Sequence, residues 1–342
     1  MGVNTSLAYR DNEYKNNGVS VSSNDCINLV AKIKRIDEYK WLNEADSMAL
    51  QQVLRDQQTA FSNFFRDNKK FRYPRFKSRK NNVNTYRTNC QNNSIRISCD
   101  EKRIKLPKIG WVKIKLSRND FSSIHHATIS RNSSGQYYVS LTCDADIDTA
   151  KIKDTEKAVG IDAGIKEFAI LSDGERISNP SFYKLAEERM TLMQRKLSRC
   201  MQGSNRYLKM KKKLAKQYQR TVNRRDDFLH KLSSSIIREN QTIKIEDLKV
   251  SNMIRNHHLS KSISDASWGR FFGMLEYKAK WYGRDFVRVD RYYPSSQMCS
   301  ECGYINKKVK NLSVRSWVCP ECLKEHDRDM NAAINILNYS LI

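Results

Sequence analysis

Residues 319–336 read CPECLKEHDRDMNAAINI, and a similar cysteine pair, CSEC, stands upstream at residues 299–302. The two C-x-x-C pairs have the spacing of a tetrahedral zinc ribbon, with four candidate ligands: Cys299, Cys302, Cys319 and Cys322. Structural zinc sites use four protein ligands and stabilise the fold. We therefore predict one structural Zn²⁺ rather than a hydrolytic one. His326 is an alternative ligand, but because the fourth cysteine is already present we expect a surface or DNA-facing histidine instead.

The composition points to a polyanionic partner. The 342 residues include 62 Lys+Arg against 37 Asp+Glu, giving a formal net charge of +25. A charge of this size favours nucleic acid as the partner, and a merely basic soluble protein is the alternative. The length allows two or three domains.

The sequence contains no signal for a membrane. No apolar run approaches the roughly 20 residues that span a bilayer, and the polar start of the chain lacks a signal-peptide pattern. The cysteines outside the two pairs are scattered, as free thiols of a reducing compartment are. This pattern predicts a cytoplasmic protein, and the residues concerned are Cys26, Cys90, Cys99, Cys143 and Cys200.

The first 80 residues are expected to be mainly helical. Residues 1–20 are rich in Asn, Ser and Asp and suggest no stable element. Residues 25–36 have helical signals, and residues 47–65 have apolar positions spaced by three, four and seven, as one face of a helix requires.

A basic segment with interleaved aromatic residues follows. Between Arg66 and Arg118 there are 17 Lys+Arg and three acidic residues. Base stacking with phosphate contacts is the functional interpretation, and a solvated loop is the alternative. The candidate nucleic-acid-binding residues here are Arg72, Tyr73, Arg75, Phe76, Lys77 and Arg79. Alternating segments at 94–98, 111–116, 127–130 and 137–141 then predict a small β-barrel or sheet.

A polar linker over residues 145–157 suggests a domain boundary. Beyond it, the pattern predicts strands at 158–164, 167–171, 242–248 and 286–290 and a helix at 268–281. Residues 184–225, with 14 Lys+Arg and two Glu, predict two antiparallel helices with a basic outer face. The candidate nucleic-acid contacts in this hairpin are Lys209, Lys212, Lys213 and Arg224.

Carboxylates stand at the edges of three of these elements: Asp162, Glu246 and one of the pair Asp327 and Asp329. The element order is that of an α/β ribonuclease H-like fold, in which such acids can meet on one side of the sheet. Two Mg²⁺ ions about 3.5–4 Å apart, held by carboxylates, can hydrolyse a phosphodiester. Taken singly, Asp162 could cap a turn and Glu246 could be a solvated strand end.

Three segments, VGIDAGIKEFAILSDG, IKIEDLKVSNM and the cysteine region through NAAINI, resemble the RuvC motifs and zinc ribbon of the TnpB (OrfB) family. These are transposon-encoded RNA-guided nucleases related to type V CRISPR effectors. The resemblance implies an α+β multidomain chain. Its expected parts are a helical recognition part (1–80), a wedge-type β-barrel (81–150), a RuvC-like domain (151–294) with a basic hairpin (183–238), a zinc ribbon (295–324) and a last RuvC segment (325–342).

By motif position, the resemblance implies that Asp162, Glu246 and Asp329 bind Mg²⁺, and that Arg315 contacts the scissile phosphate. It also implies a guide RNA from the transposon end and cleavage of double-stranded DNA beside a short motif. Gln51 and Gln52, on the expected recognition helix, are our candidates for reading that motif.

Two departures from the family pattern bear on these expectations. Family members usually begin with a basic strand of the wedge upstream of the segments matched here, so we expect an incomplete barrel. Leu323 stands where the family commonly has Gly. A non-cleaving RNA-guided repressor and a truncated, inactive transposon remnant are the rival interpretations.

Overall fold

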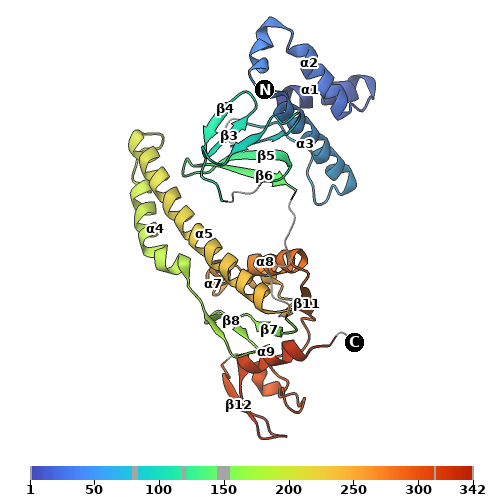
Figure 1. Ribbon diagram of the computed structural model, residues 1–342. Helices are drawn as coiled ribbons and strands as arrows, with labels where there is room; N and C mark the ends of the chain where they lie inside the picture. The colour runs from blue at the N-terminus through green and yellow to red at the C-terminus, as the bar shows by residue number, and fades with distance from the viewer. Residues whose placement is uncertain (1, 79–83, 118–120, 145–154, 312, 341–342) are drawn as a thin grey trace. The chain divides into compact units, whose positions relative to one another are not determined.

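The computed structural model describes residues 2–78, 84–117, 121–144, 155–311 and 313–340. The chain divides into two compact units, Met1–Asp146 and Ile147–Ile342 (Figure 1). Within the described ranges, none of the helices combines the length and apolar character that crossing a membrane requires.

The first unit begins with four helical elements: α1 (Gly2–Asn17), α2 (Ser23–Ile33), the 3-10 helix η1 (Asp37–Asn43) and α3 (Ser47–Arg66). The helices predicted near residues 25–36 and 47–65 are confirmed. The expectation that residues 1–20 form no stable element is wrong. Because α1 has no apolar stripe, tertiary packing stabilises it rather than its own pattern. Leu7 is 2% exposed, and the Ser6 hydroxyl donates to Gln57 of α3 at 2.8 Å.

Two antiparallel three-stranded sheets complete this unit. One has the order β1-β5-β6, formed by Thr85–Asn89, Ile124–Arg131 and Tyr137–Cys143. The other has the order β2-β3-β4, formed by Arg96–Ser98, Arg103–Leu106 and Gly110–Lys113. Both contribute to one core around Ile95, Ile104 and Ala127. All four predicted strands are present, and the sequence patterns missed β1 and β3.

A five-stranded sheet with the order β11-β10-β7-β8-β9 forms the centre of the second unit. Its strands are β7 (Ala158–Asp162), β8 (Glu167–Leu171), β9 (Arg176–Ser178), β10 (Thr242–Glu246) and β11 (Asp285–Val289). β10 runs parallel to both β7 and β11, while β8 and β9 pair antiparallel. The three parallel strands therefore end at the same edge of the sheet.

Helices cover this sheet and extend from it (Figure 1). Helices α4 (Phe182–Ser198) and α5 (Asn205–Glu239) form the predicted hairpin, with its turn beside Gly203-Ser204. After the short α6 (Val250–Met253) come α7 (Ser260–Ala266) and α8 (Trp268–Trp281). Leu229 of α5 and Phe271 of α8 are fully buried in the core that contains the sheet. The indole of Trp268 donates to the Phe168 carbonyl at 3.2 Å.

The last part contains the 3-10 helix η3 (Lys307–Lys310), the hairpin of β12 (Ser316–Val318) and β13 (Glu325–Asp327), and α9 (Arg328–Asn338). Helix α9 packs on β7 at Gly160. A Cβ at Gly160 would lie 2.5 Å from the Leu337 nitrogen and closer still to the Ala333 carbonyl. Only glycine permits this approach of helix to strand.

Candidate active site and nucleic-acid interface

Asp162 and Glu246 lie side by side at the carboxyl edge of the sheet. Ile161 pairs with Ile245 across the parallel strands β7 and β10, so the next residue of each strand is a neighbour of the other. Both isoleucines are almost fully buried, and side chains alternate between the faces of a strand. The two carboxylates therefore point to the opposite face of the sheet.

Helix α9 covers that same face. Gly160, two residues before Asp162, faces the α9 backbone. Lys244, two residues before Glu246, donates to the carbonyls of Leu337 and Tyr339, each at 2.7 Å. Lys244 thus ties the carboxyl end of α9 to β10, where a cation is favourable. Sequence reasoning missed Lys244, because its partners lie far along the chain.

Burial and neighbouring acids raise the pKa values of Asp162 and Glu246. Burial raises the pKa of Asp162 to about 7, together with the nearby charges of Asp329 and Glu246. Burial also raises the pKa of Glu246, with a further contribution from Asp247. Clustered acids with raised pKa values are typical of a site that holds cations or protons.

The two acids at the start of α9 have different surroundings. Asp327 caps the helix, accepting from the Met330 amide at 2.9 Å, and pairs with Arg176 at 3.1 Å. Although burial opposes the change, these contacts lower the pKa of Asp327. Asp329 instead contributes to the raised pKa of Asp162. The structure therefore groups Asp329, rather than Asp327, with the other two acids.

Arg315 lies beside this group. Its guanidinium is 3.4 Å from the Asp329 carboxylate, and its side chain is 62% exposed. The backbone carbonyl of Arg315 also accepts from the Arg328 amide at 2.8 Å, which joins the residue before β12 to the start of α9. Arg315 can therefore reach an anion bound at the carboxylates.

The four predicted cysteines form one cluster. Their sulfur atoms all lie within 4.8 Å of one another. The Cys299–Cys322 and Cys302–Cys319 sulfur pairs are each 3.6 Å apart. A tetrahedral ion with Zn–S bonds of about 2.3 Å spaces its sulfurs by about 3.8 Å, so the cluster fits one zinc ion.

His326 is 6% exposed and lies beside this cluster, so the expectation of a surface position is wrong. Its Nε2 atom lies 3.1 Å from the Cys299 sulfur, and its ring packs against Trp317. Burial lowers the pKa of His326, which favours the neutral imidazole. A neutral ring can donate a hydrogen bond to a thiolate.

Two buried asparagines connect the cysteine cluster to α9. The side-chain amides of Asn331 and Asn335 donate to the Met298 carbonyl at 2.7 and 2.6 Å. The Asn331 oxygen accepts from the Ser300 amide, inside the first cysteine pair, at 3.0 Å. Asn331 lies two residues after Asp329. The fold of the first cysteine pair therefore fixes the helix that contains this acid.

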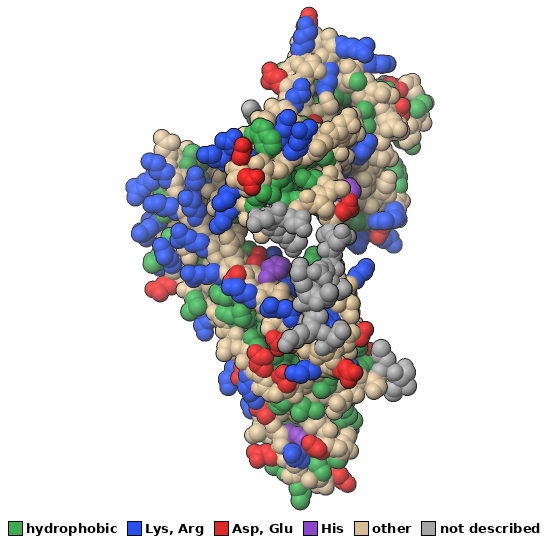
Figure 2. All heavy atoms as spheres, in the orientation of Figure 1, with side chains coloured by type: hydrophobic (Ala, Val, Ile, Leu, Met, Phe, Trp, Pro, Cys, Tyr) green, Lys and Arg blue, Asp and Glu red, His purple; other side chains and the backbone are tan. Residues whose placement is uncertain are grey.

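The α4–α5 hairpin has a dense basic surface. Lys209, Lys212, Lys213 and Arg224 are all exposed. Figure 2 shows Lys and Arg side chains gathered along this hairpin. Such a surface suits the phosphates of a nucleic acid.

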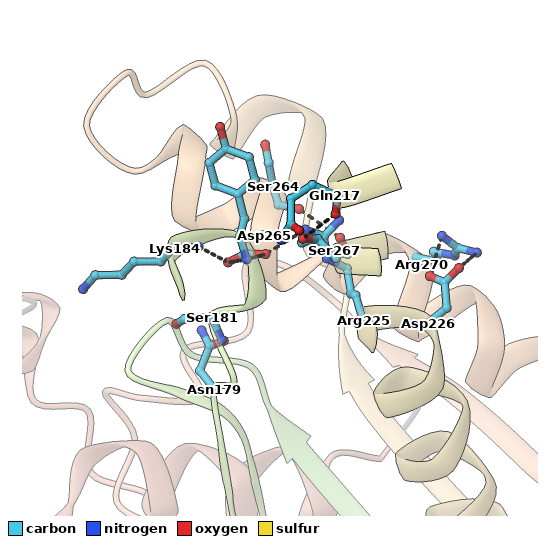
Figure 3. Close-up of polar contacts among 12 residues, drawn as sticks. Asn179, Ser181, Lys184, Gln217, Arg225, Asp226, Ser264, Asp265, Ser267 and Arg270 are labelled. Atoms are coloured by element: carbon cyan, nitrogen blue, oxygen red, sulfur yellow. Dashed lines mark hydrogen bonds and ion pairs between the residues drawn. The ribbon is translucent and has the colours of Figure 1, made fainter. Parts of the chain in front are cut away.

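Asp265 of α7 anchors both helices of this hairpin to α7 (Figure 3). Its carboxylate accepts from the Tyr183 amide at 2.9 and 3.0 Å and from the Lys184 amide at 3.4 Å, thereby capping α4. It also pairs with Arg225 of α5 at 2.7 Å, and the two side chains are 8% and 18% exposed. One carboxylate therefore joins α4, α5 and α7. No local sequence signal marks it.

Asp265→Ala is expected to destabilise the second unit. The change leaves the Arg225 guanidinium and two helix amides without their acceptor, and breaking a buried ion pair costs about 3–5 kcal/mol. At about 2–4 °C per kcal/mol, the thermal transition should fall by roughly 6–20 °C. Asp227→Ala, which removes an exposed pair with Lys231, is the matched control and should change little. Equal shifts for both variants contradict the anchor.

Residues 72–77, the aromatic and basic segment of the first unit, are mostly exposed, and the contacts of Tyr73 hold the segment in place. Arg72, Arg75 and Lys77 are exposed, and Phe76 is 56% exposed. Tyr73 packs edge-on against Phe61 and Phe64 and donates to Asp11 at 2.6 Å. Burial and this bond raise the pKa of Tyr73 to about 12. Tyr73 thus holds the segment against α1 and α3. Arg79 lies outside the described residues.

The two glutamines proposed to read the flanking motif differ in their surroundings. Gln51 is half-buried on α3. Gln52 is 9% exposed, and its amide donates to Asp56 at 2.8 Å. Base reading by Gln52 requires that this bond break first.

Comparison with known proteins gives two matches to family models. Residues 140–257 match the OrfB_IS605 model, described as a probable transposase. Residues 268–336 match the Cas12f1-like TNB domain model.

Two named relatives match most of the chain, and a third matches less than half of it. A candidate RNA-guided DNA endonuclease of Streptomyces pristinaespiralis is 42% identical over 89% of this chain and 74% of its own length. InsQ of Escherichia coli, with the same description, is 30% identical over 98% of this chain and 84% of its own length. The TnpB-like protein MJ0751 of Methanocaldococcus jannaschii is 32% identical over 40% of this chain and 50% of its own length.

Among solved structures, a chain in the Cas12f1–sgRNA–target DNA complex has a similar fold. The TM-score is 0.54 at 16% identity, covering 98% of this chain and 80% of that one. This likeness shows a shared fold, and the long matches to the two endonuclease-named relatives establish the family. The chain belongs to the TnpB (OrfB) family.

Proposed function

We propose that this protein is an RNA-guided DNA endonuclease whose active site is formed by Asp162, Glu246 and Asp329. The observation that carries the proposal is the convergence of these three acids under α9, at the edge where the parallel strands end. The names of its relatives describe the same activity.

The element layout supports a RuvC-like domain for the second unit. Its sheet order places β7 beside β10, with α9 across both. We also propose that the zinc ribbon is an insertion ahead of the last acid, and that residues 81–150 act as the wedge beside a helical recognition part.

The donor set fits divalent magnesium. All three residues offer carboxylate oxygens, which Mg²⁺ prefers, and a bound cation would offset both the burial and the charge repulsion that raise the pKa of Asp162. When bound, two such ions supply activation of a water and stabilisation of the leaving oxygen. Asp162, Glu246 and Asp329 would hold them. Arg315, exposed beside Asp329, would orient the scissile phosphate.

We propose two partners, a guide RNA from the transposon end and double-stranded target DNA. Guide pairing would select the sequence, while the protein contacts backbone and a short flanking motif. The basic α4–α5 hairpin and the 72–79 segment would bind the phosphates, so binding should weaken steeply with salt.

One purification tests the proposal. The protein is co-expressed with its native transposon-end transcript, the bound RNA is sequenced, and plasmids bearing the matching target are incubated with Mg²⁺. Bound RNA with target cleavage supports the proposal. Protection of the target without cleavage would indicate a repressor, and absence of bound RNA would indicate an inactive remnant.

Magnesium binding is expected to weaken as the pH falls below about 7. The pKa of Asp162, raised from 3.8 to about 7 in the metal-free protein, means that the ion must displace a proton below that pH. The apparent affinity should then fall about tenfold per pH unit, and remain constant above pH 7. The same raised pKa stabilises the metal-free fold fully below about pH 4, and this stability is lost as the pH rises through 7.

Calorimetric titration with Mg²⁺ at pH 6, 7 and 8, in buffers of different ionisation enthalpy, measures both affinity and proton release. Asp327→Asn is the matched control, because the pKa of Asp327 is lowered, not raised, and it should leave the pH dependence intact. An affinity that is constant from pH 6 to pH 8 contradicts the prediction.

A further inference from the structure

The turn after β11 adjoins the carboxylates. Val289, the last residue of β11, pairs with Glu246, and its carbonyl accepts from the Asp247 amide at 3.0 Å. Arg291 then donates to the Asp247 carboxylate at 2.6 Å. The turn that starts at Asp290 is therefore fixed to the residue next to Glu246, at the edge of the sheet that holds the proposed active site.

This turn is rigidly built. The Tyr292 amide donates to the Asp290 side chain at 2.7 Å, and the Tyr293 amide donates to the Asp290 carbonyl at 3.0 Å. The Tyr293 ring packs edge-on against Tyr339, beyond the end of α9, at 5.0 Å between centroids. Tyr293 thus anchors the turn on the face that α9 covers.

Tyr292 differs sharply from its neighbour. Its side chain is 85% exposed, more than any other large apolar or aromatic side chain in the described part of the chain. Burying an aromatic ring is normally favourable, so a ring held in water by a fixed turn gains nothing for the fold. An aromatic face displayed beside an active site suits a planar ligand group.

We propose that Tyr292 stacks on a nucleobase of the strand that enters the active site, close to the scissile phosphate. This inference rests on the proposed nuclease function. Base–aromatic stacking changes an affinity by about 5- to 150-fold per base and tolerates any sequence, because every base has a π-face. The base must have at least one face free, so it lies in single-stranded DNA or outside the stack, because neighbouring bases cover both faces of a base inside a duplex.

The test compares wild type with Tyr292→Phe, Tyr292→Leu and Tyr292→Ala, each purified with its RNA. Single-turnover cleavage of target DNA should fall about 5- to 150-fold for the Leu and Ala variants and stay near wild type for Phe. Binding of target through the guide should be unchanged. Leucine keeps the apolar bulk but not the ring, so the series separates stacking from packing.

A second readout uses DNA with 2-aminopurine, a fluorescent base analogue, at successive positions of the strand, in complexes prepared without Mg²⁺. At one position, fluorescence should be quenched with tyrosine or phenylalanine and restored with leucine or alanine. Equal cleavage and equal fluorescence in all four proteins overturn the proposal while leaving the nuclease assignment intact. If the wild type never cleaves, the nuclease assignment fails, and the fluorescence series still decides whether Tyr292 stacks.

Discussion

Asp162→Ala is expected to abolish target cleavage in Mg²⁺, with a loss of at least about 10³-fold, while the protein still co-purifies with its RNA. Asp162 ends the strand that pairs with the one ended by Glu246, and the charges of Glu246 and Asp329 add to burial in raising its pKa. Removing a group that stabilises charge in the transition state costs on the order of 10²–10³-fold, and here the site also loses a metal ligand. Plasmid cleavage and sequencing of the bound RNA measure the two outcomes.

Asp327→Asn is the matched control for this prediction. Asp327 stands at the same helix start as Asp329, but its carboxylate accepts a hydrogen bond from the Met330 amide and pairs with Arg176. Its loss should cost about 1 kcal/mol of stability as a cap, and cleavage should remain within a few fold of wild type. Asp329→Asn should behave like Asp162→Ala. If Asp162→Ala cuts at the wild-type rate, the carboxylate site is misassigned.

Local sequence patterns identified the candidate acids better than the residues that hold these acids in position. Asp162 and Glu246 each end a short apolar run, so the alternation of strands locates them and the parallel pairing makes them neighbours. The choice between Asp327 and Asp329 depended on family resemblance, because both lie at one helix start. The structure separates them through Arg176, more than a hundred residues upstream.

Contacts between distant segments explain what the sequence did not reveal. Helix α1 lacks an apolar stripe and depends on Ser6, Leu7 and their partners in α3. Asp265 caps a helix that begins some eighty residues earlier. A helix cap is recognisable in sequence when it is local, and this one is supplied by tertiary structure.

Loss of zinc is expected to reduce cleavage strongly, although none of the four cysteines belongs to the carboxylate site. Structural zinc contributes apparent binding free energies of about 10–16 kcal/mol in zinc-finger peptides, as much as the whole stability of a typical domain. Cys299 and Cys319 are almost fully buried and belong to the small core of the ribbon with Val309 and Trp317, so losing the ion disturbs that core directly. Cys319→Ser should lose one zinc per chain and at least about 100-fold in cleavage rate, the cost of a misplaced catalytic group.

Metal analysis and cleavage assays with Mg²⁺ present measure both effects. Cys200→Ser is the control, because Cys200 lies beyond the end of α4, outside the cluster, and donates only to a local carbonyl. It should keep its zinc and its activity. Stripping zinc with a chelator that leaves Mg²⁺ in place, without loss of cleavage, contradicts the coupling.

The asparagine pair separates a structural zinc from a hydrolytic one. Asn331→Ala removes the bonds of this residue to Met298 and Ser300, while the Asn335 bond to Met298 and all four cysteines stay in place. If zinc acts only by holding the first cysteine pair in place, this variant keeps its zinc and still loses cleavage. The reason is that Asp329, two residues away, is no longer held in position. If zinc itself hydrolysed the DNA, activity would follow zinc content, and Asn331→Ala would retain both. The ribbon would then influence cleavage through the position of α9, although none of its cysteines needs to touch the DNA.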